Sequence, residues 1–206
     1  MKPMVFFCQP LYGYIPPLAD GQQKEWLGFN LSRGLLSAVL CRANTYIDRA
    51  RNDLVSEVLD MTVASHIFFA DQDMTFPQHT LPSLLDAKQD VVSGVYFGKD
   101  EFATLVAYGN LNPGDRLTDF DPDNVQQVPG IGMGCALIRT EVFRIMESTF
   151  TDRKWFSASE CGEDLHFSRR CHELGIPIHL DGRVKCGHAG DKLITMKEWK
   201  MARGKI

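Results

Sequence analysis

The chain has 206 residues, of which 44% are hydrophobic and 23% are charged. This length and this balance are those of one globular domain with its own core, and they exclude wholesale disorder. The formal net charge of −4 gives no overall attraction to nucleic acid or to an anionic membrane. No stretch approaches the roughly 20 apolar residues that span a bilayer, so we expect no transmembrane segment.

The first apolar run and the cysteines indicate the cellular compartment of the protein. Residues 4–8 form a run that is too short for a signal peptide, and Gln9-Pro10 follows it without a small-residue cleavage site. The six cysteines are scattered and form no C-x-x-C pair, so a zinc site and disulfides are both unexpected. We therefore expect a cytoplasmic protein whose cysteines are mostly buried thiols.

Short apolar runs alternate with helical patterns through the first half of the chain. Runs of apolar residues bounded by turn formers predict strands at 4–8, 35–41, 65–70 and 90–95. Between them the pattern predicts helices at 22–32, 48–59 and 80–87, the second with Asp48 as its N-cap. Strands separated by helices predict an α/β fold with a mostly parallel central sheet flanked by helices.

The second half predicts irregular structure before the alternation resumes. Residues 97–129 are rich in Asp, Asn, Gly and Pro, which predicts loops and a small antiparallel excursion. A strand at 132–138 then leads into a helix from Thr140, which we expect to act as its cap. A helix at 162–174, a short strand at 178–180 and a polar C-terminal helix complete the prediction.

Two aspartates directly follow the strand predicted at 65–70. Asp71 and Asp73 stand one residue apart where the chain leaves that strand, and ligands of open α/β sheets collect at such strand ends. Both carboxylates can reach one hard divalent cation, Mg²⁺ or Mn²⁺, which prefers oxygen ligands and bridges to phosphates. Aspartate is also a common turn former, so this pair alone leaves a structural role open.

Two helix starts carry further charged residues. Arg51 lies in the first turn of the helix predicted at 48–59, where a guanidinium can hold a diphosphate. Glu163 and Asp164 open a later helix, a position that suits a general base for a hydroxyl group. The ordinary alternatives are a solvated helix end for the arginine and a stabilising N-terminal charge bias for the carboxylates.

A late histidine and a basic tail are the remaining candidates. His188 follows Gly187 and precedes Gly190, so we expect a flexible, exposed imidazole suited to metal ligation, although a lone loop histidine usually has no such role. The basic residues of the C-terminal segment could cover a diphosphate or contact a polyanionic acceptor, but they are also typical of a solvated helix. They are Lys192, Lys197, Lys200, Arg203 and Lys205.

The order and spacing of these motifs resemble the GT-A fold glycosyltransferases, particularly the family 2-like enzymes. The resemblance covers nearly the whole chain. It is carried by residues 5–10, Arg51-Asn52, Asp71-Gln72-Asp73 with Phe76-Pro77, residues 92–96, 132–139 and 162–165, and His188. It implies a single GT-A, Rossmann-like domain over 1–206, with a nucleotide-sugar-binding half at 1–95 and an acceptor and catalytic half at 96–206.

The resemblance also implies roles for individual residues. Mn²⁺ or Mg²⁺ would be held by Asp73 and His188, with Asp71 approaching the metal through water or facing the ribose. Asp164 corresponds to the catalytic base of inverting members, and Glu163 would contact a sugar. The residues implied to bind the nucleotide-sugar are Pro10, Tyr12, Arg51, Asp71, Gly132 and Gly134.

The implied reaction moves a sugar from a nucleotide-sugar donor, in the first place a UDP-sugar, to an acceptor hydroxyl. The acceptor stays open among a glycan, a lipid-linked sugar and a hydroxymethylated base in nucleic acid. Because retaining members share the D-x-D motif and the metal-binding histidine, the stereochemistry also stays open.

Three other interpretations compete with this one. A haloacid-dehalogenase-type phosphatase would use Asp71 as nucleophile and Asp73 as acid/base, but its motif normally sits on the first strand, whereas this one is about the third. A sugar-nucleotidyltransferase would need a glycine-rich basic signature that residues 5–17 lack. A non-catalytic nucleotide-sugar-binding module on the same fold is the third.

Overall fold

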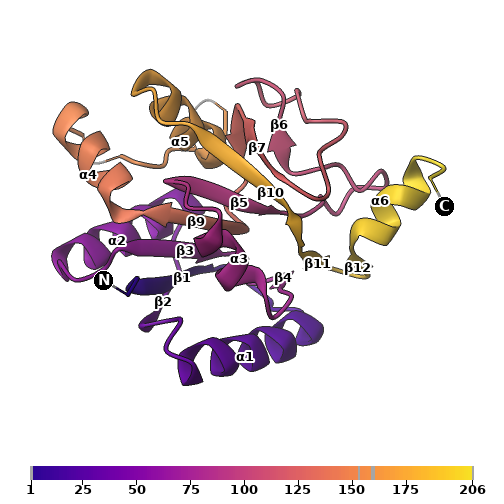
Figure 1. Cartoon of the computed structure of the whole chain (residues 1–206), viewed down its shortest axis with the longest axis horizontal. Coiled ribbons are helices and arrows are strands. Elements are labelled where there is room, and N and C mark those ends of the chain that lie inside the picture. Colours follow the sequence, from indigo (N-terminus) through magenta and orange to yellow (C-terminus); the bar gives the residue numbers. More distant parts are fainter. Residues whose placement is uncertain (1, 153, 159–160, 206) are drawn as a thin grey trace.

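The protein is described by a computed structural model that covers residues 2–152, 154–158 and 161–205. Its centre is a seven-stranded sheet, which crosses the middle of Figure 1. The strands are β1 (Val5–Leu11), β2 (Ala38–Ala43), β3 (His66–Ala70), β5 (Val91–Val95), β7 (Val125–Val128), β9 (Cys135–Arg139) and β10 (Ile178–Lys185). They are ordered β2-β1-β3-β9-β5-β10-β7.

Most of the sheet is parallel, as the sequence predicts. Strand β1 pairs in parallel with β2 and β3, and β5 pairs in parallel with β10. Strand β9 is antiparallel to both of its neighbours, β3 and β5, and β7 is antiparallel to β10. The sheet is thus a Rossmann-like parallel array with one reversed strand inside it and one at its edge.

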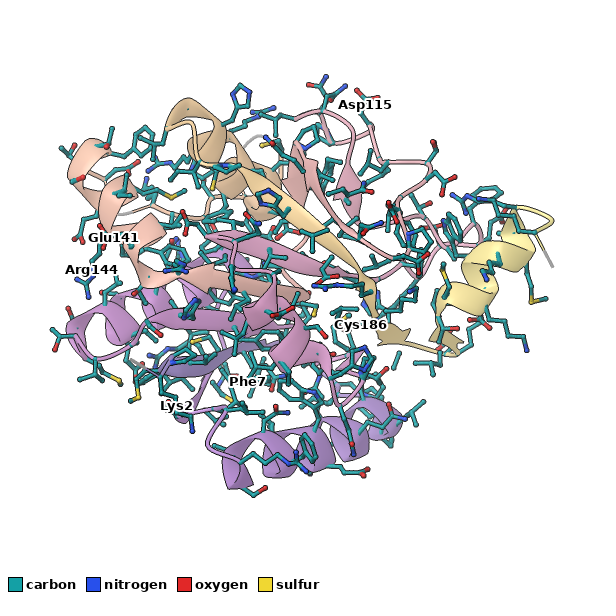
Figure 2. All side chains as sticks on the ribbon, viewed as in Figure 1. Lys2, Phe7, Asp115, Glu141, Arg144 and Cys186 are labelled. Carbon is teal, nitrogen blue, oxygen red and sulfur yellow. The ribbon has the colours of Figure 1, made fainter. Side chains whose placement is uncertain are left out.

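Helices cover both faces of the sheet (Figure 1). On one face lie α1 (Pro17–Ser32) and α3 (Thr80–Asp86), and on the other lie α2 (Ile47–Asp60), α4 (Thr140–Thr149) and α5 (Glu163–Glu173). Strand β1 shows why both faces need cover. Phe7 packs toward Trp26 of α1, where Figure 2 marks it, while its neighbour Phe6 belongs to the core beneath α2.

Two small sheets and a final helix complete the fold. Strands β4 (Met74–Thr75), β11 (Gly187–Ala189) and β12 (Leu193–Ile194) form one small sheet, and β6 (Ala107–Tyr108) pairs with β8 (Gly130–Ile131) in the other. The predicted antiparallel excursion is therefore confirmed. The last helix, α6 (Met196–Ala202), lies beside β12 and buries Trp199 against Phe97.

Several predicted boundaries are wrong for local reasons. Helix α1 begins at Pro17, because proline is well suited to the first helical position. Tyr46, not Asp48, is at the N-cap of α2, and Thr140 is the first residue of α4, its hydroxyl donating to the Ala64 carbonyl at 2.9 Å. Strand β10 extends to Lys185.

Within the described ranges, no helix combines the length and hydropathy that a membrane crossing requires.

Candidate active site

The pairing of β11 with β4 brings His188 beside the D-x-D segment. His188 lies opposite Met74 in an antiparallel register, and the Ala189 amide donates to the Asp73 carbonyl at 2.7 Å. Gly187 lies opposite Thr75 in the same register, where a Cβ atom would overlap the threonine hydroxyl. Glycine at this position therefore permits the close pairing of β11 with β4, which brings the imidazole of His188 to the carboxylate of Asp73.

His188 is held in one orientation rather than being flexible and exposed. Its side chain is 16% exposed, and its Nδ1 atom lies 2.9 Å from the Phe97 carbonyl, which can only accept a hydrogen bond. Nδ1 therefore carries a hydrogen, and Nε2 faces Oδ1 of Asp73 at 3.3 Å. The expected exposed loop is wrong because β11 incorporates this residue into a sheet.

Asp73 has a second neighbour, Lys99, which the sequence did not indicate. The ammonium group of Lys99 makes an ion pair with Oδ2 of Asp73, while His188 approaches Oδ1. Burial alone would raise the pKa of Asp73, but its hydrogen bonds and charge interactions with His188 and Lys99 lower that pKa to about 2. Among the described residues no group of three His, Cys, Asp or Glu side chains is clustered around a cation position.

A buried arginine connects the two acidic motifs. Arg51 is 1% exposed, and its Nη2 donates to Oδ1 of Asp71 at 2.7 Å. Its Nη1 donates to a carboxylate oxygen of Glu163 and lies 3.5 Å from Oδ1 of Asp164. Burial lowers the pKa of Arg51, but the three carboxylates raise it by more, so the guanidinium stays charged.

Asp164 has the properties of a proton acceptor. Burial raises its pKa, Arg51 opposes that rise, and Glu163 and Asp71 add to it, with a result of about 7. Its Oδ1 atom is buried and accepts no hydrogen bond from the described residues. A carboxylate in this state can accept a proton near neutral pH, because a catalytic base works best with a pKa near the working pH.

A cavity of about 410 Å³ opens beside the D-x-D segment. Its lining includes Pro10 and Tyr12, both expected from the sequence, and Tyr46, which was not. Tyr12 and Tyr46 are 73% and 71% exposed, and both also line an adjoining cavity of about 660 Å³. The first cavity is completed by Ile47, Asp71, Gln72, Asp73 and His188.

Two glutamines fix the backbone of this region. Gln72 bonds through its side-chain amide to the backbone N–H and C=O of Tyr12 and to the Tyr14 carbonyl. Gln23, buried on α1, donates to the carbonyls of Asp71 and Met74 at 2.9 and 2.7 Å. The turn that carries the aspartates is therefore tied to the segment after β1 and to α1. These roles of the two glutamines were not predicted from the sequence.

Gly132 and Gly134 leave room for an aromatic ring. A Cβ atom at Gly132 would overlap the hydroxyl of Tyr96, and one at Gly134 would lie 2.9 Å from its ring. The Gly134 amide donates to that hydroxyl at 3.0 Å. Burial raises the pKa of Tyr96, and the charges of Asp164 and Asp71 raise it further, so the phenol remains neutral among the carboxylates.

The segment before α5 is fixed by packing. Trp155 and Phe156 are 2% and 1% exposed, and Phe156 stacks on Phe167 with ring centroids 5.3 Å apart. The side chain of Asn52, next to Arg51, bonds both the N–H and the C=O of Phe156 at 3.0 and 2.8 Å. These contacts hold the start of α5 against α2, which sets the position of the acidic pair.

Comparison with known proteins gives evidence on the fold. No family model matches the chain, and no curated protein matches it by sequence. Among solved structures, A197 from STIV is similar over 93% of both chains, with a TM-score of 0.64 and 20% identity. The structure of GalNAc-T7 with UDP, GalNAc and Mn²⁺ is similar over 98% of this chain, with a TM-score of 0.52 and 10% identity.

The chain spans about half of the GalNAc-T7 chain, of which 48% is covered. At these identities the likeness concerns the arrangement of helices and strands alone. The fold is accordingly GT-A-like.

Proposed function

We propose that the protein is a metal-dependent glycosyltransferase that moves a sugar from a nucleotide-sugar, in the first place a UDP-sugar, to an acceptor hydroxyl. The observation that carries this proposal is the Arg51 network. One buried guanidinium contacts Asp71, at the proposed metal and donor end, and also Glu163 and Asp164, at the proposed base. Donor binding and proton abstraction would thus occur within one connected site.

The donor set fits a hard divalent cation, Mn²⁺ or Mg²⁺. The support is the orientation of His188, because an Nδ1–H bonded to the Phe97 carbonyl leaves Nε2, on the side of Asp73, as the nitrogen that can bind a metal. We propose that Asp73 and His188 hold the metal and that Asp71 approaches it directly or through water. When bound, the cation would neutralise the leaving nucleoside diphosphate.

The nucleotide is proposed to lie along residues of the first half, 1–95. Tyr12 and Tyr46 offer exposed aromatic faces on the cavity that reaches Asp71 and Asp73. Pro10 lies on the same wall. A solved structure of similar fold contains UDP and Mn²⁺, which supports the donor class.

The acceptor is proposed to lie over the second half, 96–206, with Asp164 as the base. Its raised pKa suits it to take the proton of the acceptor hydroxyl. Arg51 holds both this carboxylate and that of Glu163 in place, and Glu163 would contact a sugar. Gly132 and Gly134 are proposed to present backbone to the donor sugar beside Tyr96.

The test separates metal binding from proton abstraction. Asp73→Ala should abolish Mn²⁺-dependent binding of UDP, measured by titration calorimetry. Asp164→Asn should leave UDP affinity nearly unchanged but lower the rate of UDP release from a UDP-sugar plus acceptor, by about 10²–10⁴-fold, as expected for loss of a general base. Asp60→Asn, an exposed change at the end of α2, is the matched control for removing one carboxylate.

Other outcomes would identify the rival functions. Release of inorganic phosphate from phosphate monoesters that depends on Asp71 would favour the phosphatase. Metal-dependent binding of UDP without turnover of any UDP-sugar, alone or with glycan acceptors, would favour the binding module. Equal loss of UDP affinity in Asp73→Ala and Asp164→Asn would contradict the proposed division of roles.

A further inference from the structure

Lys99 stands at the tip of a tightly held hairpin. Phe97 and Leu105 form a β-bridge, and the Gly98 amide donates to the Thr104 carbonyl at 2.7 Å. Within the turn, the carboxylate of Asp100 accepts hydrogen bonds from the backbone amides of Phe102 and Thr104. The backbone that presents Lys99 is therefore well defined.

The same hairpin orients both basic neighbours of Asp73. The Phe97 carbonyl at its base fixes the imidazole of His188, and Lys99 at its tip reaches the other oxygen of the Asp73 carboxylate. The alkyl chain of Lys99 passes Gly190, where an added Cβ atom would lie 3.1 Å from the lysine Cδ. The lysine is thus guided to the carboxylate by the segment that also carries His188.

A divalent cation on Asp73 would disturb this ion pair. The ammonium group and a metal ion would compete for the same carboxylate, and their like charges would repel each other at short range. The Lys99 side chain is 39% exposed, so its ion pair contributes little stability and is easily exchanged. A cavity of about 530 Å³ next to it, lined also by Gly190 and Lys192, gives the side chain room to move.

We propose that Lys99 is a donor-binding residue that occupies Asp73 in the metal-free protein and moves onto the diphosphate of the donor when the metal binds. This inference rests on the proposed function. A lysine suits both positions, since its ammonium is a compact charge on a flexible chain and binds phosphate as readily as carboxylate. The donor diphosphate, joined to the metal, would lie within reach of the displaced ammonium.

The proposal predicts effects of opposite sign for one substitution. In Lys99→Met, Mn²⁺ should bind the nucleotide-free protein more tightly, by about 2–5-fold. The metal then no longer competes with the lysine ammonium for the Asp73 carboxylate, and the exposed ion pair that it replaced was weak. With Mn²⁺ saturating, UDP should bind about 10-fold or more weakly, the usual cost of losing a charge-assisted hydrogen bond. Electron paramagnetic resonance of free Mn²⁺ gives the first affinity, and calorimetry gives the second.

Two variants serve as controls. Lys192→Met removes a positive charge from the same cavity. In the described part of the chain Asp73 pairs with Lys99 and His188 and not with Lys192, so the Mn²⁺ affinity of this variant should equal that of wild type. Lys99→Arg keeps the charge and should retain most of the UDP affinity. Thermal unfolding of each variant checks that the exposed substitutions leave the fold intact.

The outcomes distinguish this inference from the proposed function. If wild-type protein binds UDP with Mn²⁺ but Lys99→Met changes neither affinity, or changes both in one direction, the role of Lys99 is overturned and the proposed function stands. If wild-type protein binds no UDP in the presence of Mn²⁺, the proposed function fails and the diphosphate role of Lys99 fails with it.

Discussion

At the scale of single residues, one buried guanidinium holds together carboxylates that would otherwise repel one another. Arg51 carries one positive charge, and it faces Asp71, Glu163 and Asp164. The negative charges exceed the positive one, and the burial of this cluster makes the excess costly. Protonation of Asp164 relieves that cost, which explains why its pKa rises while Arg51 stays charged.

This arrangement predicts how transfer depends on pH. A base must be deprotonated to act, so kcat/KM should increase with pH and reach half its plateau near pH 7, where Asp164 titrates. Glu163→Gln removes a charge that raises the pKa of Asp164, and it should move that midpoint to lower pH. A pH–rate profile of both proteins measures the shift, and an unchanged midpoint would contradict the electrostatic coupling.

The raised pKa of Asp164 also predicts that the protein loses stability as the pH rises. The folded-state pKa of Asp164 lies above the unfolded value of about 4. The contribution of Asp164 to the free energy of unfolding is therefore most favourable below pH 4 and is lost as the pH rises through 7. Asp164→Asn has no carboxyl group here and does not suffer this loss. The free energy of unfolding of the variant minus that of wild type should therefore be larger at pH 8 than at pH 4.5. Urea denaturation at the two pH values measures it, and a difference independent of pH would contradict the raised pKa.

At the scale of elements, short pairings assemble the site from segments far apart in the chain. The D-x-D motif and the late histidine could be predicted from the sequence, but their contact depends on the pairing of β4 with β11. Strands of two and three residues carry too little pattern to be predicted. Lys99 and Gln23 were missed for a related reason, since a loop lysine and a helical glutamine have no local signature.

Strand direction was the other limit on prediction. The apolar pattern located β9, and the alternation of strands and helices predicted the parallel core of the sheet. An apolar run has the same pattern in either direction, however, so the insertion of β9 antiparallel between β3 and β5 was not predictable. That insertion carries Gly134 to the D-x-D segment, where its carbonyl accepts from the Asp71 amide at 3.3 Å.

The β4–β11 pairing can be tested at Gly187. In Gly187→Ala the added Cβ atom would overlap the hydroxyl of Thr75, and we expect β11 to shift and displace His188 from Asp73. We expect Mn²⁺ affinity to fall by about tenfold or more, the effect of losing ligand orientation. Paramagnetic resonance of Mn²⁺ measures the affinity without requiring turnover.

A second substitution provides the control for this prediction. Thr75→Ala removes the hydroxyl and makes room, so the double variant Gly187→Ala with Thr75→Ala should regain Mn²⁺ affinity. Thr75→Val fills the same space and should not restore it. Equal behaviour of the two double variants would show that the overlap is not the cause of the loss.

At the scale of the whole molecule, the two proposed halves share one sheet. Residues 1–95 supply β1, β2, β3 and β5, while β7, β9 and β10 come from residues 96–206. Strand β9 is inserted between β3 and β5, and β10 pairs along β5, so each half completes the other. The basic tail joins this assembly through α6, where Arg203 and Lys205 lie over the buried Trp199 rather than in solvent alone.

This interleaving predicts that neither half folds by itself. A fragment of residues 1–95 would lack the strand between β3 and β5, leaving both of those edges unpaired and Phe69 without the Phe143 and Phe156 rings that cover it. We expect each fragment alone to show no cooperative thermal transition by circular dichroism, whereas the full chain unfolds in one transition. Mixing the fragments should restore structure if the sheet reassembles across them. A cooperative transition in the isolated 1–95 fragment would contradict a shared core and would favour two separate folding units.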